Sequence, residues 1–374
     1  MKKLLREAWR AVTGLKAGDS QRDDKPASGS SGAGMSDADA VFEGALAAHQ
    51  AGNLSEAQAT YHRILKHVPD HAPALHFLGV SHGQTGDLEQ AETLIRQSIR
   101  LLPIPEYFGN LAMVLDRQGR HDEAIAARRK AAELAPDNTA LLMALGDTLA
   151  AAGRSAEAEE PFRAALRLLP EDADIFFKLA ELLVRLQRND EAVEAYRGAL
   201  IRRPLFPDAS NNLGNLLAAM GRDAEAEATY RQVLSLQPDA AAVHCNLGQL
   251  LQKTGRFEEA EAAFSKALEL QPGFTAALNS IGNLYAASGR SADAVQAYRR
   301  AIELRPDYAD VHNNLGNLLK SLGQRDEAEA AYRKSLSIKP DFAKAWSNFA
   351  LLMEEAGRME EAEAAHQQVL SLTN

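Results

Sequence analysis

The feature of this sequence that most constrains its fold is a proline that returns about once every 34 residues. The intervals all measure 34 residues, except for one of 33. The prolines are Pro69, Pro103, Pro136, Pro170, Pro204, Pro238, Pro272, Pro306 and Pro340. The segments before them are close copies of one another, as residues 211–238, 245–272, 279–306 and 312–340 show. A fixed period of this length predicts a repeat architecture, in which each unit buries its apolar face against its neighbours.

Each unit carries the same pattern of large and small residues when it is numbered from the third residue after the preceding proline. Large apolar residues recur at the seventh and eleventh places, an aromatic at the twenty-fourth, and small residues at the eighth and twentieth. In the unit that begins at Ala309, these residues are Leu315, Leu319, Tyr332, Gly316 and Ala328. The pattern predicts two helices, joined by a turn at Gly323 because glycine can adopt the left-handed conformation that ends a helix. The closing proline ends the second helix, since it has no amide hydrogen to donate.

These residues make the chain resemble the tetratricopeptide repeat (TPR) family, whose 34-residue helix-turn-helix unit has this pattern. The resemblance covers residues 38–374 in ten units, and it implies an all-α, right-handed solenoid or superhelix. Three units depart from the pattern. The first has Gly44 at the seventh place, the third is one residue short and has Arg128 at the aromatic place, and the fifth has Gln187 instead of the turn glycine. We expect the least regular packing in these three units.

Composition agrees with an all-helical chain and argues against catalysis. Hydrophobic residues make up 46% of the chain and aromatic residues only 6%, which suits short packed helices, and no alternating strand pattern persists. Cys245 is the only cysteine, which excludes an internal disulfide and a multi-cysteine zinc site. No phosphate-binding loop, paired-histidine zinc motif or nucleophile elbow occurs. We therefore predict a protein that is not an enzyme, with no catalytic residues, no metal and no cofactor.

Histidines gather near the start of the predicted array. Six of the ten lie within 34 residues, namely His49, His62, His67, His71, His76 and His82. Such a group raises the possibilities of a metal site and of a pH sensor. The six scatter over several helix faces without a ligand-spacing motif, which argues against a metal site.

The first residues differ in kind from the array. Residues 1–16 combine an apolar face, which includes Leu5, Trp9 and Val12, with five basic residues and one acid, and predict a basic amphipathic helix. Residues 17–37 read as a flexible linker rich in Gly, Ser and Asp. The helix could lie on an anionic membrane, dock on a partner, or be an exposed tail. A further possibility is that translation begins at Met35 rather than Met1.

Net charge separates these two parts and excludes one class of partner. The whole chain has a formal net charge of -10, and residues 1–34 carry seven basic and four acidic residues, which leaves -13 for the array. Phosphate backbones are bound by clustered cations. We therefore expect protein partners and no nucleic acid.

The first helix of each unit carries asparagines, which are poor helix formers. Helical spacing places the second, sixth, ninth and thirteenth residues on one stripe, roughly opposite the apolar seventh and eleventh. The sixth place holds Asn212, Asn246, Asn314 and Asn348, besides Asn110. The ninth place holds Asn215, Asn283 and Asn317, besides Gln249, and the fifth holds Asn211, Asn279 and Asn313. Stacking the units would turn these amides into a ladder.

Two interpretations of this ladder remain open. Side-chain amides both donate and accept, so they can bind the peptide groups of an extended chain in a concave groove. The motifs "NNLGNLL" and "CNLGQLLQ" resemble the TPR superhelix of the O-linked N-acetylglucosamine transferases, and this resemblance implies a peptide-binding role for the ten asparagines of residues 211–348 named above. The other interpretation is that the asparagines bond between neighbouring helices. Phe77, Ala144 and Lys178 interrupt the ladder at the sixth place.

These observations predict a non-catalytic scaffold that binds an extended polypeptide segment. The transferases carry a catalytic region that has no counterpart here, so one alternative is an accessory subunit that recruits substrates for a separately encoded glycosyltransferase. Another is a peripheral membrane assembly factor that contacts the membrane through residues 1–16. We expect a cytoplasmic protein, with the inner face of a membrane as the alternative location.

The last unit has no capping helix after it in this sequence. Its apolar face around Trp346, Phe349 and Val369 is therefore expected to be open to solvent or to another subunit. Self-association through the C-terminal repeat follows as a hypothesis.

Overall fold

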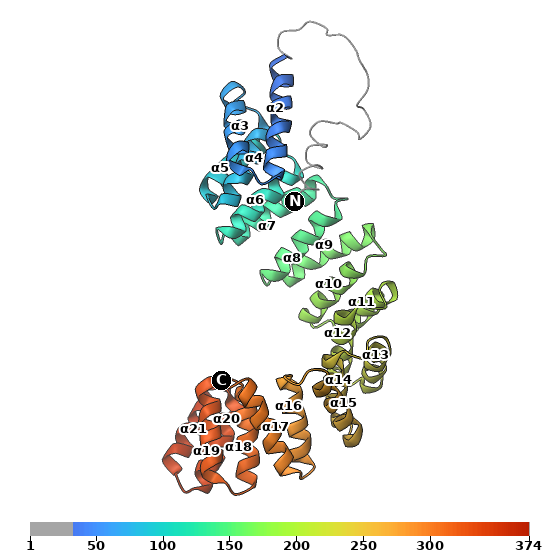
Figure 1. Ribbon diagram of the computed structural model, residues 1–374, viewed down its shortest axis with the longest axis vertical. Helices are drawn as coiled ribbons and strands as arrows, with labels where there is room; N and C mark the ends of the chain where they lie inside the picture. The colour runs from blue at the N-terminus through green and yellow to red at the C-terminus, as the bar shows by residue number, and fades with distance from the viewer. Residues whose placement is uncertain (1–32, 374) are drawn as a thin grey trace. The chain divides into compact units, whose positions relative to one another are not determined.

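The computed structural model describes residues 33–373, and the predicted amphipathic helix at residues 1–16 lies outside this range. All regular structure within the described range is helical, in twenty helices with no strand (Figure 1). The chain divides into two compact units, up to Ala195 and from Tyr196 onward, and each is described by itself. The predicted all-helical repeat fold is confirmed.

In every repeat except that of α10 and α11, an even-numbered first helix packs against an odd-numbered second helix. In the first unit the helices are α2 (Ala33–Gln50), α3 (Leu54–His67), α4 (Ala72–Thr85), α5 (Leu88–Leu101), α6 (Pro105–Arg117), α7 (His121–Leu134), α8 (Thr139–Ala151), α9 (Ser155–Leu168) and α10 (Ala173–Arg185). The unit boundary falls within α11 (Asn189–Arg202). Every second helix from α3 to α9 also contacts the next first helix, so the repeats form a continuous stack within this unit.

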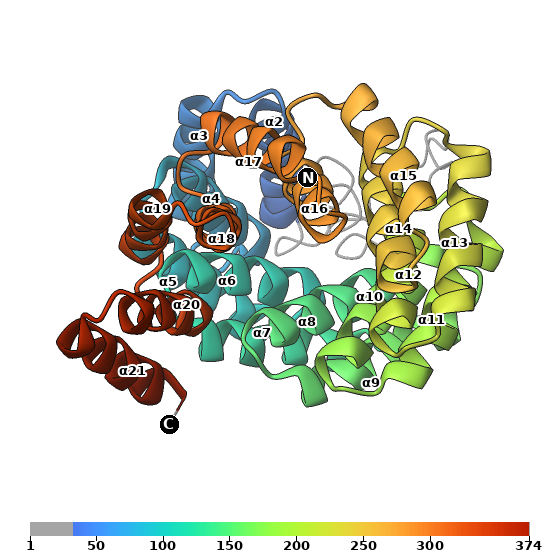
Figure 2. The same ribbon diagram turned by 90° about the horizontal axis from the view of Figure 1, so that it is seen from below.

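The second unit continues the same alternation. Its helices are α12 (Pro207–Ala219), α13 (Asp223–Leu236), α14 (Ala241–Lys253), α15 (Phe257–Leu270), α16 (Thr275–Ala287), α17 (Ser291–Leu304), α18 (Ala309–Ser321), α19 (Arg325–Ile338), α20 (Ala343–Glu355) and α21 (Met359–Thr373). Each first helix contacts the next first helix as well as its own second helix. Within this unit the first helices α14, α16 and α18 lie on the inner side of the curve that Figure 2 shows. The side chains of successive first helices are therefore close enough to meet.

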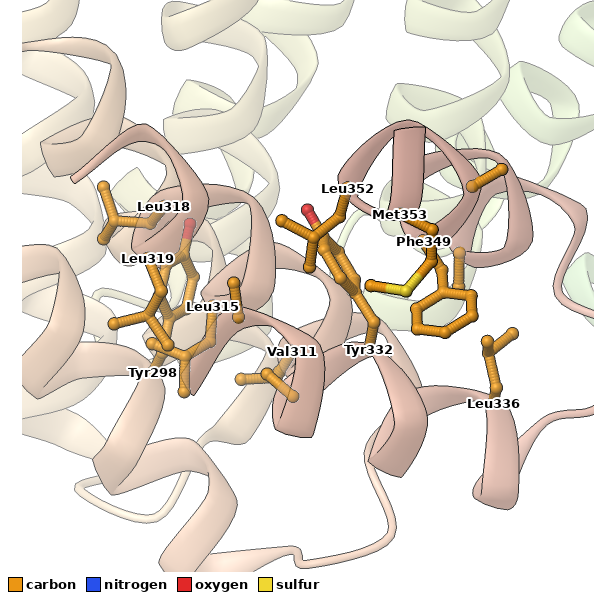
Figure 3. Packing of buried hydrophobic residues seen from close by; sticks show 14 of the residues in the cluster. Tyr298, Val311, Leu315, Leu318, Leu319, Tyr332, Leu336, Phe349, Leu352 and Met353 are labelled. Atoms are coloured by element: carbon orange, nitrogen blue, oxygen red, sulfur yellow. The ribbon is translucent and has the colours of Figure 1, made fainter. Parts of the chain in front are cut away.

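Close approach of the two helices in a repeat depends on the glycine at the eighth place. A Cβ atom added to Gly316 would lie 2.8 Å from the ring of Tyr332, the aromatic at the twenty-fourth place, and one added to Gly282 would lie 2.6 Å from the ring of Tyr298. Tyr298 and Tyr332 belong to one buried cluster with Leu315, Leu319 and Met353 (Figure 3). This contact between a small residue and an aromatic ring therefore fixes how tightly these repeats pack.

The turn between the two helices uses a left-handed residue in every repeat, and in the fifth repeat that residue is not glycine. The turn glycines have φ angles between 74° and 97°. Gln187 adopts the same conformation with a φ of 61°, and it is the only non-glycine residue with positive φ in residues 33–373. The turn of the fifth repeat therefore forms without glycine, and the left-handed conformation of Gln187 costs about 1 kcal/mol.

Replacing Gln187 with glycine should stabilise the chain. We expect Gln187→Gly to raise the free energy of unfolding by about 1 kcal/mol, because it removes the left-handed strain. The matched control is Gly221→Gln at the same place of the next repeat, where φ is 76° and the change should be of similar size and opposite sign. Urea denaturation followed by circular dichroism measures both. No difference between the two variants would contradict this explanation of the fifth turn.

The first repeat begins earlier than predicted. The helix α2 begins at Ala33, within the stretch predicted as linker and ahead of residue 38. The rest of the unit keeps its predicted register, because the turn glycine Gly52 has positive φ and Ala57 and Tyr61 are buried at the twentieth and twenty-fourth places. Gly44, noted above as a departure at the seventh place, is exposed.

In the third repeat, the arginine at the aromatic place forms an ion pair with an aspartate. Arg128 stands where other repeats have an aromatic ring, and its guanidinium Nη2 donates to Asp116 Oδ2 at 2.6 Å. The side chain is 15% exposed, so the pair is largely withdrawn from water. An ion pair therefore replaces the ring packing of this repeat.

The second helices are linked by rings of two arginines and two glutamates. At the junction of the sixth and seventh repeats, Arg231 bonds Glu227 at 2.8 Å and Glu259 at 3.2 Å, and Arg256 bonds the same two carboxylates at 2.7 Å each. Equivalent rings consist of Arg96, Arg120, Glu92 and Glu123; Arg163, Arg188, Glu159 and Glu191; and Arg333, Arg358, Glu329 and Glu361. Burial alone would raise the pKa of Glu227, but the hydrogen bonds from Arg231 and Arg256 lower it overall. Each ring fixes the guanidinium positions at a junction.

The apolar face predicted to be open at the last repeat is largely closed. Phe349 is only 4% exposed and packs in the core cluster, and Trp346 is partly buried with its Nε1 donating to the Pro340 carbonyl oxygen at 2.8 Å. Helix α21 covers this side of α20. The exposed apolar residues of the repeat are instead Leu351, Met359, Leu370 and Leu372.

Candidate functional site

The predicted asparagines bond across neighbouring first helices. Asn246 on α14 donates through Nδ2 to Asn211 Oδ1 on α12 at 2.6 Å. Asn314 on α18 donates in the same way to Asn279 on α16 at 3.0 Å, and Asn348 on α20 donates to Asn313 on α18 at 2.9 Å. In each case the sixth-place amide donates to the fifth-place amide of the preceding repeat. We call these contacts the amide rungs.

At some junctions the same two places hold residues other than asparagine. At the junction of α14 and α16 these places hold Cys245 and Ser280, and the Ser280 hydroxyl accepts from Gln249 Nε2 at 3.0 Å. Burial raises the pKa of the Cys245 thiol to about 11, which the neighbouring Ser280 only partly offsets, so the thiol stays protonated near neutral pH. Amide rungs therefore join α12 to α14, α16 to α18, and α18 to α20. In the first unit, Asn110 and His76 make an equivalent contact at 2.8 Å.

The ninth-place asparagines are held within their own repeat. The hydroxyl of Tyr230 donates to Asn215 Oδ1 at 2.6 Å, and Tyr298 and Tyr332 donate to Asn283 and Asn317 at 2.7 Å. Sequence reasoning missed this contact, although the sequence carried a signal for it. Repeats with an asparagine at the ninth place have tyrosine at the twenty-fourth, whereas those with Asp147 or Gln249 at the ninth place have phenylalanine.

These bonds leave a defined set of polar groups open. Within residues 33–373, the Nδ2 groups of Asn215, Asn283 and Asn317 have no hydrogen-bond partner, and Asn215 is exposed while the other two are partly exposed. The rung donors Asn246 and Asn348 likewise keep Oδ1 open. The first-helix face of α12 to α20 therefore presents both donors and acceptors, which we call the amide face.

Two predicted site residues stand apart from this arrangement. Asn313 is only 1% exposed, and its Nδ2 bonds Asn314 Oδ1 at 3.4 Å while its Oδ1 accepts from Asn348, so it supports the stack and offers no open surface. The side chain of Asn212 is partly exposed and makes no hydrogen bond within the described part of the chain. The predicted interruption at Lys178 has its own partner, since its ammonium bonds Asp147 at 2.8 Å.

Other kinds of site find no support in the residues that the structure covers. No group of three or more histidine, cysteine, aspartate or glutamate side chains is placed to hold a metal ion within them. None of the helices α2 to α21 is long and apolar enough to cross a membrane.

Comparisons with known proteins place the chain in a family. Profiles described as tetratricopeptide repeat match residues 42–103, 105–171, 173–204, 205–273 and 309–342, and one described as TPR repeat matches residues 282–323. The matches span nearly all of residues 42–342. The chain belongs to the tetratricopeptide repeat proteins.

One solved structure agrees at the level of the TPR fold, and a second shares part of the sequence. A crystal structure of a tetratricopeptide repeat protein from Parabacteroides merdae has a TM-score of 0.54 and 19% sequence identity, and the match covers 67% of this chain and 98% of that one. A crystal structure of MamA is 28% identical with a TM-score of 0.39, covering 43% of this chain and 94% of that one. A search of curated proteins found no match. TPR arrays are generally non-catalytic scaffolds for protein–protein interaction, and the repeats described above are of this kind.

Proposed function

We propose that this TPR chain binds an extended polypeptide segment along the amide face. The observation that carries the proposal is the fixed orientation of the ninth-place amides. Each of Asn215, Asn283 and Asn317 has its oxygen bonded by a buried tyrosine, while its NH₂ group remains open. An amide fixed in this way loses little rotational freedom when it binds a carbonyl oxygen, which favours affinity.

The spacing of the amide face suits a peptide backbone. First helices that pack directly lie about 8–10 Å apart, and an extended chain advances about 3.3–3.6 Å per residue. One repeat therefore spans about three peptide residues. The open NH₂ groups can bind peptide carbonyl oxygens, and the open Oδ1 atoms of Asn246 and Asn348 can accept from peptide N–H groups.

The amide rungs bear on how the proposal can be tested. Changing Asn246, Asn314 or Asn348 to alanine removes a donor from the stack as well as a group from the surface, so a loss of binding would have two explanations. The ninth place avoids this difficulty. Aspartate there still accepts the tyrosine hydroxyl bond but has no NH₂ group to donate to a ligand.

The test is partner capture by the full chain with three ninth-place changes, Asn215→Asp, Asn283→Asp and Asn317→Asp. Crosslinking in native lysate followed by mass spectrometry should recover partners with the wild-type chain that are lost with this variant. A second variant combines Tyr230→Phe, Tyr298→Phe and Tyr332→Phe, which removes the three internal bonds that the aspartate variant keeps and leaves the amides in place. Because these amides can still donate but no longer have a fixed orientation, this variant should lose fewer partners than the aspartate variant. An unchanged partner list for the aspartate variant would contradict the proposal.

A second candidate function rests on the motifs "NNLGNLL" and "CNLGQLLQ". Their resemblance to the superhelix of O-linked N-acetylglucosamine transferases supports a role in delivering polypeptides to a separately encoded transferase. The same capture experiment tests it. Co-purification of a glycosyltransferase that persists in the aspartate variant, while polypeptide cargo is lost, is the expected result. Recovery of cargo without any transferase would argue against this second role.

A further inference from the structure

A pocket of about 450 Å³ lies at the junction of the sixth and seventh repeats, away from the amide face. Its apolar wall comes from Leu234 on α13, Leu247 and Leu251 on α14, and Ala262 and Ala263 on α15. None of the asparagines of the amide face lines it. The pocket therefore belongs to the side of α14 that faces the second helices.

The junction of the ninth and tenth repeats shows what occupies this space when side chains are larger. The part of the wall that comes from the second helices is the same there, because Leu336 and Ala365 stand at the places of Leu234 and Ala263. The first-helix residues differ at three places. His244, Leu247 and Leu251 line the pocket, whereas α20 has Trp346, Phe349 and Met353 at the same places. Phe349 and Met353 belong to the core cluster (Figure 3), and Trp346 packs against it.

Arg231 is placed to cover an aromatic ring that binds in the pocket. The guanidinium carbon of Arg333 lies 4.9 Å from the centre of the Phe349 ring, a cation–π contact. Arg231 stands at the same place of its repeat and is held by the same ring of ion pairs, through Glu227 and Glu259. It lines the pocket with a leucine in place of the phenylalanine. The positive charge and the apolar wall together complement the negative face of an aromatic ring.

We propose that this pocket is a docking site for an aromatic side chain of a partner protein, whose ring packs against Leu247 and beneath Arg231 as the Phe349 ring packs beneath Arg333 in the last repeat. The site is distinct from the amide face and does not depend on the function proposed for it. It gives the chain a second contact, on the opposite side of the first helix, for a partner that carries an exposed phenylalanine or tryptophan.

The probe for this site is N-acetylphenylalaninamide, titrated into the full chain with labelled leucine methyl groups. We expect saturable NMR shifts at Leu234, Leu247 and Leu251. N-acetylleucinamide, which has the same backbone without a ring, should bind at least tenfold more weakly. Absence of saturable shifts with the aromatic probe, or equal binding of the leucine probe, would overturn the proposal.

Two variants copy side chains that the chain already uses. Leu247→Phe should fill the pocket and weaken probe binding at least tenfold. His244→Trp should do the same and keep the local hydrogen bond, since His244 Nε2 and Trp346 Nε1 both contact the carbonyl oxygen of the closing proline, at 2.9 and 2.8 Å. Unchanged probe binding in a folded variant would count against the site.

The same spectra decide between a partner protein and a second copy of this chain. Phe257 is 46% exposed and could insert into the pocket of another molecule. Concentration-dependent shifts of the pocket methyl groups without any probe, removed by Phe257→Ala, would show self-association and overturn the assignment to a partner. Spectra independent of concentration are expected.

Discussion

Lowering the pH from 7 to 5 should destabilise the first repeats of the array well before the rest of the chain. His76 is 1% exposed, lies against the Tyr107 ring with centroids 3.9 Å apart, and accepts from Asn110 Nδ2 through Nε2 at 2.8 Å. Burial, followed by the charge of nearby His49, lowers the pKa of His76 to about 3. Burial also lowers the pKa of His49, although its bond to Gln84 partly offsets this.

The direction and size of this change in the free energy of unfolding follow from proton linkage. Below pH 6.5 the unfolded chain binds protons at these two histidines while the folded chain does not, so the free energy of unfolding falls as pH falls. For His76 alone, the loss at pH 5 is about 2 kcal/mol, from 1.5 pH units at 1.36 kcal/mol each. The glutamates of the ion-pair rings, such as Glu92, have lowered pKa values. Their contribution to stability is therefore lost only as pH falls below the ordinary glutamate pKa of about 4.5. The interval from pH 6.5 to 5 therefore isolates the histidines.

Hydrogen exchange between pH 7 and pH 5, corrected for intrinsic rates, measures this effect by region. Loss of protection should concentrate in residues 37–134. The variant His76→Asn, which introduces the residue used at Asn211, Asn279 and Asn313, should remove most of the acid sensitivity when combined with His49→Gln. The exposed His62 provides the control, since His62→Asn should leave the pH dependence unchanged. Uniform loss of protection along the chain would refute the assignment.

Replacing the eighth-place glycine should destabilise a repeat as strongly as a core mutation. In Gly214→Ala, the new Cβ atom would lie 2.3 Å from Tyr230 Cε1 and 2.8 Å from Cζ. The ring must move, and its hydroxyl then loses the bond to Asn215. Overpacking at about 1–3 kcal/mol and the lost bond at about 1 kcal/mol predict a loss of about 2–4 kcal/mol.

The matched control is Gly109→Ala within α6, where an added Cβ atom meets nothing within 4 Å. Because alanine is the better helix former, this change should stabilise the chain by up to about 1 kcal/mol. Urea denaturation of the two variants, followed by circular dichroism, tests the pair. A loss of less than 1 kcal/mol in Gly214→Ala would mean that the ring position is not fixed by the glycine.

The sequence was sufficient to predict that the two helices of a repeat approach closely at small residues, but not the tyrosine–asparagine bonds within a repeat. Gly316 and Tyr332 recur at fixed places in copy after copy, so their pairing could be inferred from size alone, and the structure places them in contact. The turns were also predictable from their glycines. Gln187 shows, however, that the two flanking helices can hold another residue in the left-handed conformation. The early start of the first helix, at Ala33, was missed because the repeat pattern begins only at residue 38.

Contacts between repeats were harder to predict. Asn246 bonds Asn211, 35 residues away, because the rotation from one repeat to the next brings the sixth place of one helix beside the fifth place of its predecessor. The spacing of residues along one helix does not determine this rotation between repeats. The pocket beside Leu247 was likewise not predictable from the sequence, because it depends on the sizes of side chains from three helices together.

The measurement that tests the central claim most directly is the affinity of a captured partner segment, made as a synthetic peptide, for three forms of the full chain. The first is the wild type, and the second carries aspartate at Asn215, Asn283 and Asn317. The third controls for charge with Ala219→Asp, Ala287→Asp and Ser321→Asp, which adds three carboxylates to the same helices and keeps every amide.

If the amide face binds the peptide backbone, loss of three hydrogen bonds worth about 1 kcal/mol each should weaken binding by the aspartate variant about 100-fold. The charge control should stay within a few-fold of the wild type. Replacing single peptide amides with esters should also weaken binding, whereas alanine substitutions of the peptide side chains should have little effect. Equal affinity of the wild type and the aspartate variant, with both folded, would contradict the account.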